Sequence, residues 1–154
     1  MPNDSRSLLL KKANLLLADF ERAARRLDDA LRQPESEFLR DAAIQRFEFC
    51  FELAWKSVQA VARLEGQDCA SPRTAFSLAW HNGWLADEAA WLSMLDDRNK
   101  TSHTYREAMA EEVFRTLPDH LAQFSHLEGA LITGGSGDRS VGARTAVRHL
   151  IARM

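Results

Sequence analysis

Apolar residues recur along this chain at the spacing of an α-helix, and this feature limits what the chain can fold into. From Leu9 to Ala30 they follow one another in steps of three or four residues, and the same steps recur from Ile44 to Val61. Such spacing places the apolar side chains on one face of a helix. No segment combines alternating polar and apolar residues with hairpin turn residues. The sequence therefore predicts an all-α fold.

Residues that start or stop helices divide this pattern into segments. Serine or aspartate can cap the first turn, proline fits the first helical position, and glycine or proline ends a helix. They delimit two long helices, a third that is broken in two, and a last helix containing Pro118, where we expect a kink or a new start. We therefore predict an antiparallel, up-and-down four-helix bundle with a broken third helix. The residues concerned are Pro34, Ser36, Gly66, Ser71, Pro72, Asn82, Gly83 and Asp87.

Charge divides the chain into two parts. The length of 154 residues fits one domain, and the overall net charge of −2 is not typical of a nucleic-acid-binding protein. Residues 130–154 nevertheless carry a net charge of +3, and residues 1–129 carry −5. We expect a folded unit at residues 5–129, then a glycine-rich linker and basic tail at 130–154. A short helix near Val147 is the alternative to a solvated tail.

The cysteines and the apolar runs bear on the protein's location. Cys50 and Cys69 are too few for a disulfide framework and lack C-x-x-C spacing. No run approaches the ~20 apolar residues of a membrane span, and the start of the chain lacks an apolar signal segment. We therefore expect a cytoplasmic protein without a membrane partner, in which Cys50 is buried as a small apolar side chain.

The segment from Arg98 to Arg106 carries the residues most suited to chemistry. It contains three cationic side chains, those of Arg98, Lys100 and Arg106, together with His103 and no acidic residue. Arginine can hold a phosphodiester through two hydrogen bonds, and histidine can transfer a proton near neutral pH. Together they would support metal-independent RNA cleavage, in which the 2′-hydroxyl attacks and no protein nucleophile is needed. The alternative is that Arg98 pairs with Asp97 or a neighbouring carboxylate and that His103 is a loop residue.

The spacing of Arg98 and His103 limits how both side chains can reach one phosphate. Arg98 and His103 are five residues apart, which is about 140° around a continuous helix. They can contact one phosphate only if the helix breaks between them or a second subunit contributes.

Thr104 and Glu107 have the spacing of a capping box, which predicts Tyr105 as the first residue of the last helix. Free backbone amides at such a helix start attract phosphate.

Other polar residues leave alternatives open. Glu48, Glu52 and Lys56 share one face of the second helix, where they either form solvated or inter-helix ion pairs or support a cleft near Arg98. The pair Asp96–Asp97 has no histidine or cysteine at ligand spacing, so we expect no metal site and no cofactor. The remaining histidines are isolated in sequence, and we expect them at surface or capping positions: His81, His120, His126 and His149.

Several motifs together resemble a known family. Between about residues 8 and 127, the chain is similar to the nucleotidyltransferase substrate-binding protein family, a branch of the HEPN superfamily of helical bundles. Two separate motifs agree, one in the second helix and one around Arg98. The segments that carry the resemblance are Arg46-Phe47-Glu48, Phe51-Glu52-Leu53-Ala54-Trp55-Lys56, Ser71-Pro72-Arg73, Trp91 and Arg98-Asn99-Lys100-Thr101-Ser102-His103-Thr104-Tyr105.

This resemblance implies a ribonuclease toxin that acts as a homodimer. Members are four-helix bundles encoded beside a minimal nucleotidyltransferase, and many HEPN proteins cleave RNA with an Arg-x4–6-His motif that meets across the dimer. The motif corresponds to Arg98 and His103, the expected catalytic residues. In the subset with Arg-x4-His-x-Tyr, the nucleotidyltransferase antitoxin transfers AMP to the tyrosine and silences the toxin. That tyrosine corresponds to Tyr105, the only tyrosine in the chain.

In the same resemblance, Asn99 lies beside the motif arginine and would help to bind phosphate. The charges of Lys100 and Arg106 favour the same role.

The resemblance also leaves a second function open. The chain could instead be a non-catalytic, substrate- or nucleotide-binding subunit of a two-component nucleotidyltransferase. It is not expected to be the nucleotidyltransferase itself, because no Asp-x-Asp follows the glycines at residues 134–137.

Overall fold

The structure is a computed structural model that describes residues 2–133. Within that range it contains five α-helices, one 3-10 turn and no strand, which confirms the all-α prediction. The elements are α1 (Pro2–Leu31), α2 (Glu37–Leu64), α3 (Pro72–His81), α4 (Glu88–Lys100), η1 (Thr101–His103) and α5 (Glu107–Thr133). The glycine-rich segment, the basic tail and the helix considered near Val147 lie outside the described residues.

Most helix boundaries fall where the local sequence predicts them. The side chains of Ser36, Ser71 and Asp87 each accept a hydrogen bond from a backbone N–H in the first turn of α2, α3 and α4. Gly66 and Gly83 follow α2 and α3 with positive φ angles of 74° and 76°. Glycine adopts such angles without the steric cost that a Cβ atom would bring. Short-range interactions therefore determine where these helices begin and end.

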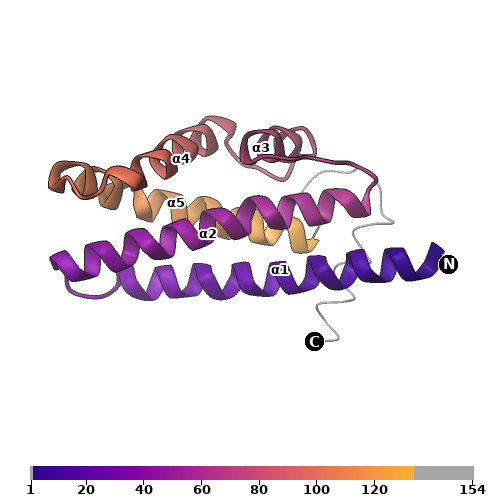
Figure 1. The fold of residues 1–154 in the computed structure, drawn as a ribbon, viewed down its shortest axis with the longest axis horizontal. Helices are drawn as coiled ribbons and strands as arrows, with labels where there is room; N and C mark the ends of the chain where they lie inside the picture. The colour runs from indigo at the N-terminus through magenta and orange to yellow at the C-terminus, as the bar shows by residue number, and fades with distance from the viewer. Residues whose placement is uncertain (1, 134–154) are drawn as a thin grey trace.

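The long helices α1, α2 and α5 pack together, and the shorter helices α3 and α4 lie on one side of them (Figure 1). α1 and α2 run side by side in opposite directions, and α5 packs against both of them. The shorter helices α3 and α4 cover the remaining side, where α3 contacts α2 and α4 contacts α5. A loop at residues 82–87 separates α3 from α4. This arrangement brings Arg98, in the last turn of α4, within 3.8 Å of Glu52 of α2.

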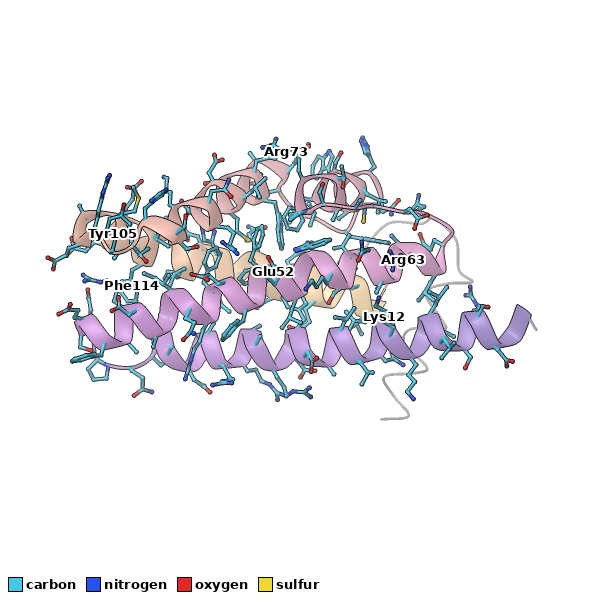
Figure 2. The ribbon with its side chains drawn as sticks, viewed as in Figure 1. Lys12, Glu52, Arg63, Arg73, Tyr105 and Phe114 are labelled. Carbon is cyan, nitrogen blue, oxygen red and sulfur yellow. The ribbon has the colours of Figure 1, made fainter. Side chains whose placement is uncertain are left out.

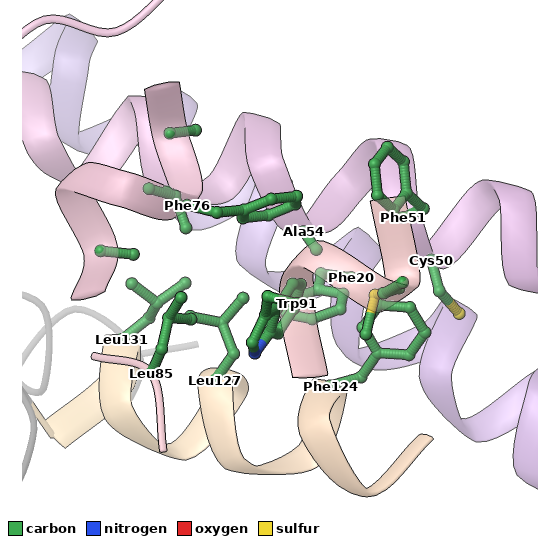
Figure 3. Packing of buried hydrophobic residues seen from close by; sticks show 14 of the residues in the cluster. Phe20, Cys50, Phe51, Ala54, Phe76, Leu85, Trp91, Phe124, Leu127 and Leu131 are labelled. Atoms are coloured by element: carbon green, nitrogen blue, oxygen red, sulfur yellow. The ribbon is translucent and has the colours of Figure 1, made fainter. Parts of the chain in front are cut away.

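One aromatic side chain from each helix meets in the core (Figure 3). The ring centroids of Phe20 and Phe124 lie 5.9 Å apart and those of Trp91 and Phe124 lie 5.8 Å apart, both edge to face. The ring centroid of Phe76 lies 4.7 Å from that of Trp91 and 5.6 Å from that of Phe51. Edge-to-face contacts between buried rings add stability beyond their apolar area. Because the chain of contacts includes all five helices, it fixes α4 relative to α2.

Of the two outcomes expected at Pro118, a kink or a new start of the helix, the new start is wrong. α5 does not restart at Pro118 but runs through it, although proline has no N–H to donate to the preceding turn. Trp55 is only partly buried at the edge of the core, where its indole Nε1 donates to Glu52 Oε2 at 3.1 Å. Among residues 2–133, no helix is both long and apolar enough to span a membrane.

Candidate active site

The predicted catalytic residues lie where α4 ends. Arg98 occupies the last turn of α4, and His103 ends the 3-10 turn η1 that follows. The α-helix therefore breaks between Arg98 and His103, which is one of the two conditions for a shared phosphate. Tyr105 follows in the turn before α5, at the end of the molecule where α4 and α5 meet (Figure 2).

Arg98 is held against α2 by contacts from three sides. Its Nη2 lies 3.8 Å from Glu52 Oε1, and its Nη1 donates to Thr101 Oγ1 at 3.3 Å. The guanidinium carbon lies 6.0 Å from the centroid of the Phe51 ring. The Arg98 side chain keeps 31% of its surface exposed. These contacts orient the guanidinium group, and part of the side chain remains accessible to solvent.

Glu52 is the carboxylate that pairs with Arg98. The sequence left open whether Glu48, Glu52 and Lys56 form solvated or inter-helix ion pairs or support a cleft near Arg98. The contact between Glu52 and Arg98 is an inter-helix ion pair, and the Glu52 carboxylate also lies 3.8 Å from Lys56 Nζ. Glu48 lies one turn earlier on α2 and is half-buried. The position of Glu52 agrees with a supporting role beside Arg98, although Asp97 had been the nearer candidate in sequence.

His103, Tyr105 and Arg106 form an exposed group next to this site. The rings of His103 and Tyr105 lie 6.1 Å apart and nearly perpendicular, and the Arg106 guanidinium carbon lies 5.6 Å from the Tyr105 ring centroid. The side chain of Tyr105 is 75% exposed. A phenol in this position can be reached by an enzyme, and a cation stands beside it.

Lys100 and Asn99 differ in how freely they could meet a phosphate. Lys100 Nζ lies 2.9 Å from Glu112 Oε1 and 3.7 Å from Asp97 Oδ1. The hydrogen bond to Glu112 and the negative charge of that residue raise the pKa of Lys100. Asn99 is exposed, and its carbonyl accepts a hydrogen bond from Ser102 Oγ at 2.9 Å. The ammonium group of Lys100 is thus already engaged by carboxylates, whereas the Asn99 side chain is exposed to solvent.

The predicted capping box at Thr104 is wrong. α5 begins at Glu107, so Tyr105 lies in a turn and is not the first helical residue. Thr104 Oγ1 donates backward to the Thr101 carbonyl at 3.1 Å, because the chain leaves α4 through a 3-10 turn that Thr104 completes. The start of α5 lies instead beside Arg40 of α2, whose guanidinium is 3.9 Å from the Glu107 carboxylate.

A buried pair that the sequence analysis missed joins α4 to α5 directly before Arg98. His120 Nε2 lies 2.7 Å from Asp97 Oδ2, and both side chains are nearly inaccessible. The His120 ring stacks on Phe47 with 5.3 Å between centroids. The expectation that His120 is a surface or capping residue is therefore wrong. Its spacing from Leu117 and Phe124, three and four residues away on the apolar face of α5, was the signal available in the sequence.

Comparison with known proteins now adds the family. The family model "Nucleotidyltransferase substrate binding protein like" matches residues 15–132. The chain belongs to this family. The match covers the C-terminal half of α1, all of α2, α3 and α4, and all of α5 except its last residue, Thr133. It confirms the resemblance predicted from the motifs in the second helix and around Arg98.

Individual relatives extend this finding. The chain is 32% identical over 93 residues to a Haemophilus influenzae protein named probable ribonuclease HepT; the match covers 55% of this chain and 62% of that relative's length. It resembles a crystal structure from Thermus thermophilus with 42% identity and a TM-score of 0.69, covering 73% of this chain and 98% of the other.

Two further solved structures share the fold. A Haemophilus influenzae structure, solved as the fold of a substrate binding domain of a nucleotidyltransferase, has 26% identity and a TM-score of 0.60 over 79% of this chain and 98% of the other. A chain in a mutant form of the toxin-antitoxin MntA-HpeT has 18% identity and a TM-score of 0.66 over 79% of this chain and 97% of the other. At 18% identity, the similarity to the MntA-HpeT chain concerns the fold alone.

Proposed function

We propose that this protein is a ribonuclease toxin of the HEPN type, which cleaves RNA without a metal ion and acts as a homodimer. The observation that carries the proposal is Arg98, partly exposed beside Glu52 at the end of α4, with His103 exposed on the turn that follows. The likeness to a protein named probable ribonuclease HepT supports this activity. The helices would form the up-and-down four-helix bundle of the superfamily, with α3 and α4 as its broken third helix.

Arg98 and His103 would share the chemistry of cleavage. Arg98 would bind the scissile phosphate and stabilise the negative charge that develops on it. As the 2′-oxygen bonds to phosphorus, the bond from phosphorus to the 5′-oxygen breaks and a 2′,3′-cyclic phosphate remains. His103 would accept the proton of the 2′-hydroxyl or donate one to the leaving 5′-oxygen. A dimer offers a second His103 for the other of these two roles.

Neighbouring residues would hold the rest of the RNA strand. Asn99 and Arg106 are exposed and would contact phosphates that flank the cleaved bond. Lys100 would join them once its ion pair with Glu112 opens. Glu52 and Lys56 would support Arg98 from α2, and half-buried Glu48 lies on the same helix.

The partner in this proposal is a minimal nucleotidyltransferase antitoxin that transfers AMP to Tyr105. The Tyr105 phenol oxygen would attack the α-phosphorus of ATP, and pyrophosphate would leave. The exposure of Tyr105 and the nearby Arg106 guanidinium, 5.6 Å from its ring, favour this site. The added phosphate would bring negative charge beside His103, so it would repel RNA from the site.

Expression without the partner tests the toxin proposal. The wild-type chain should arrest growth and cleave RNA in a buffer containing EDTA, and both Arg98→Ala and His103→Ala should abolish these effects. His126→Ala is a matched control, because His126 is exposed on α5 outside this site. A wild-type protein that is harmless and leaves RNA intact would contradict the proposal.

Intact mass after co-expression with the nucleotidyltransferase tests the modification. A gain of about 329 Da per AMP group is expected, and Tyr105→Phe should abolish it. Tyr105→Phe should also keep the protein toxic when the antitoxin is present. An unchanged mass in the wild type under conditions that neutralise its toxicity would contradict AMP transfer.

A second candidate function is a non-catalytic subunit that binds substrate or nucleotide for the nucleotidyltransferase. It is favoured by the family to which the chain belongs and by the Haemophilus influenzae structure solved as such a domain. This function predicts saturable nucleotide binding or a tight complex with the partner, without RNA turnover. The EDTA cleavage assay above separates it from the toxin function.

A further inference from the structure

The groove between α1 and α2 contains an open pocket that the proposed catalytic residues do not explain. Its volume is about 250 Å³, and it is lined by three arginines, one aspartate and apolar side chains. This volume is smaller than the roughly 300–1,000 Å³ of sites for drug-sized ligands, so it suits a group the size of one nucleotide. The residues used below are Asp19, Arg22, Arg26, Arg46, Phe49 and Leu53.

The lining of this α1–α2 pocket is positively charged. Three guanidinium groups share the pocket with a single carboxylate, that of Asp19, which pairs with Arg22. The Arg46 side chain is fixed across the groove, because its Nη1 donates to the Arg26 carbonyl at 2.6 Å. Two positive charges are therefore left without a neutralising carboxylate among the lining residues, which favours a ligand with a phosphate group.

An exposed aromatic ring lies at the same pocket. Phe49 is 52% exposed although it belongs to α2, one of the two longest helices of the described chain. A large apolar side chain that remains accessible next to arginines is typical of sites where a nucleobase stacks on a ring and a backbone phosphate meets a cation. Leu53 provides a second apolar wall.

The pocket lies next to the Arg98 site on the surface of α2. Phe49 precedes Glu52 by three residues, which is about 4.5 Å along the helix axis, and Glu52 contacts Arg98. Leu53 follows Glu52 directly, so one helical turn of α2 contributes residues to both places. A single strand whose cleaved phosphate contacts Arg98 can thus place a neighbouring nucleotide in the pocket.

We propose that the α1–α2 pocket binds one nucleotide of the single-stranded RNA substrate, with its base against Phe49 and its phosphate on Arg26 and Arg46. This inference rests on the proposed ribonuclease function and adds a substrate subsite to it. The subsite increases affinity for a strand longer than the two nucleotides that flank the cleaved bond, and it has no part in the chemical step.

Binding of a fluorescein-labelled single-stranded RNA to the full-length chain tests this assignment. The measurement is made in His103→Ala so that the RNA stays intact, with Phe49→Ala or Arg26→Ala added. Each addition should raise the Kd about tenfold, in line with the loss of one stacked base or one phosphate contact. Phe38→Ala and Arg32→Ala are matched controls, because Phe38 is exposed on α2, Arg32 is exposed directly after α1, and neither lines the pocket.

Cleavage kinetics separate a subsite from a structural effect. In the wild-type background, Phe49→Ala should raise KM for a long RNA about tenfold with kcat unchanged, and it should leave cleavage of a dinucleotide unaffected. Helical circular dichroism should match the wild type, since Phe49 is half-exposed. Equal Kd and KM values for Phe49→Ala, Arg26→Ala and the wild type would overturn the assignment.

The outcomes also distinguish this inference from the proposed function. If the wild type binds RNA through Phe49 but does not cleave it, the ribonuclease proposal fails and the pocket assignment stands. If the wild type cleaves RNA and both pocket variants behave like it, only the pocket assignment fails. Saturable binding of ATP that Phe49→Ala removes, with RNA binding unchanged, would overturn RNA as the occupant.

Discussion

The buried pair between Asp97 and His120 provides the sharpest test of how the site is held. His120→Phe keeps a flat ring against Phe47, whose centroid lies 5.3 Å away, but removes the nitrogen 2.7 Å from Asp97 Oδ2. The Asp97 side chain is only 7% exposed. Its remaining partner is then Lys100, whose Nζ lies 3.7 Å from Asp97 Oδ1. The substitution therefore leaves a buried carboxylate with one distant partner.

The expected loss of stability follows from that geometry. Removing one partner of a buried, hydrogen-bonded pair costs about 3–5 kcal/mol, and the remaining Lys100 contact favours the lower end of that range. We expect the free energy of unfolding to fall by about 3 kcal/mol in His120→Phe. Urea denaturation followed by helical circular dichroism measures this change. At a slope of about 2 kcal/mol per M, the midpoint should fall by about 1.5 M.

A double variant distinguishes the lost interaction from a general packing defect. Asp97→Leu combined with His120→Phe removes both polar groups, so no unpaired carboxylate remains buried. The double variant should therefore be more stable than His120→Phe alone. A loss below about 1 kcal/mol in His120→Phe, where a buried group left unpaired should cost at least that much, would refute the reasoning. So would a double variant less stable than the single one.

Three further predictions concern titration and capping. Burial raises the pKa of Cys50 to about 12, so iodoacetamide at pH 8 should leave it unmodified in the native protein, as mass spectrometry would detect, and label it after denaturation. Burial, and then the nearby charge of Glu21, raises the pKa of Glu128 above 4.5, so wild-type stability falls as pH rises through that raised pKa. Glu128→Gln should therefore increase the melting temperature at pH 7 but not at pH 3. Ser71→Ala removes the capping box of α3 and should cost about 1 kcal/mol in urea denaturation, while Ser77→Ala on the exposed face of α3 serves as the control with little change.

Helix positions were predictable because they depend on neighbours in sequence. The caps Ser36 and Asp87 bond to backbone groups three residues away, and Gly66 adopts a positive φ that few other residues tolerate. The apolar spacing likewise predicted which faces of α1 and α2 are buried. A local pattern that fits two structures can give a wrong prediction. Thr104 has the spacing of a helix cap, but its hydroxyl donates to the preceding Thr101 carbonyl.

The candidate site was predictable only in part. Arg98, His103 and Tyr105 were identified from one continuous segment, because residue type and spacing within it suit phosphate chemistry. Glu52 was named among three residues that could support the site, but its ion pair with Arg98 was not predicted, because the two residues are far apart in sequence. The same holds for His120, whose isolated position in the sequence gave no indication of Asp97 as its partner.

The helical class, most helix ends and the segment that carries the proposed chemistry were all predictable without the structure. These depend on backbone hydrogen bonds and amphipathic spacing, which act over a few residues. The contacts between charged and polar groups became known from the folded chain: Arg98 with Glu52, Asp97 with His120, and the arginines around Phe49 in the α1–α2 pocket. Those contacts depend on how the helices pack, because the aromatic side chains between them set the register at which distant residues face each other.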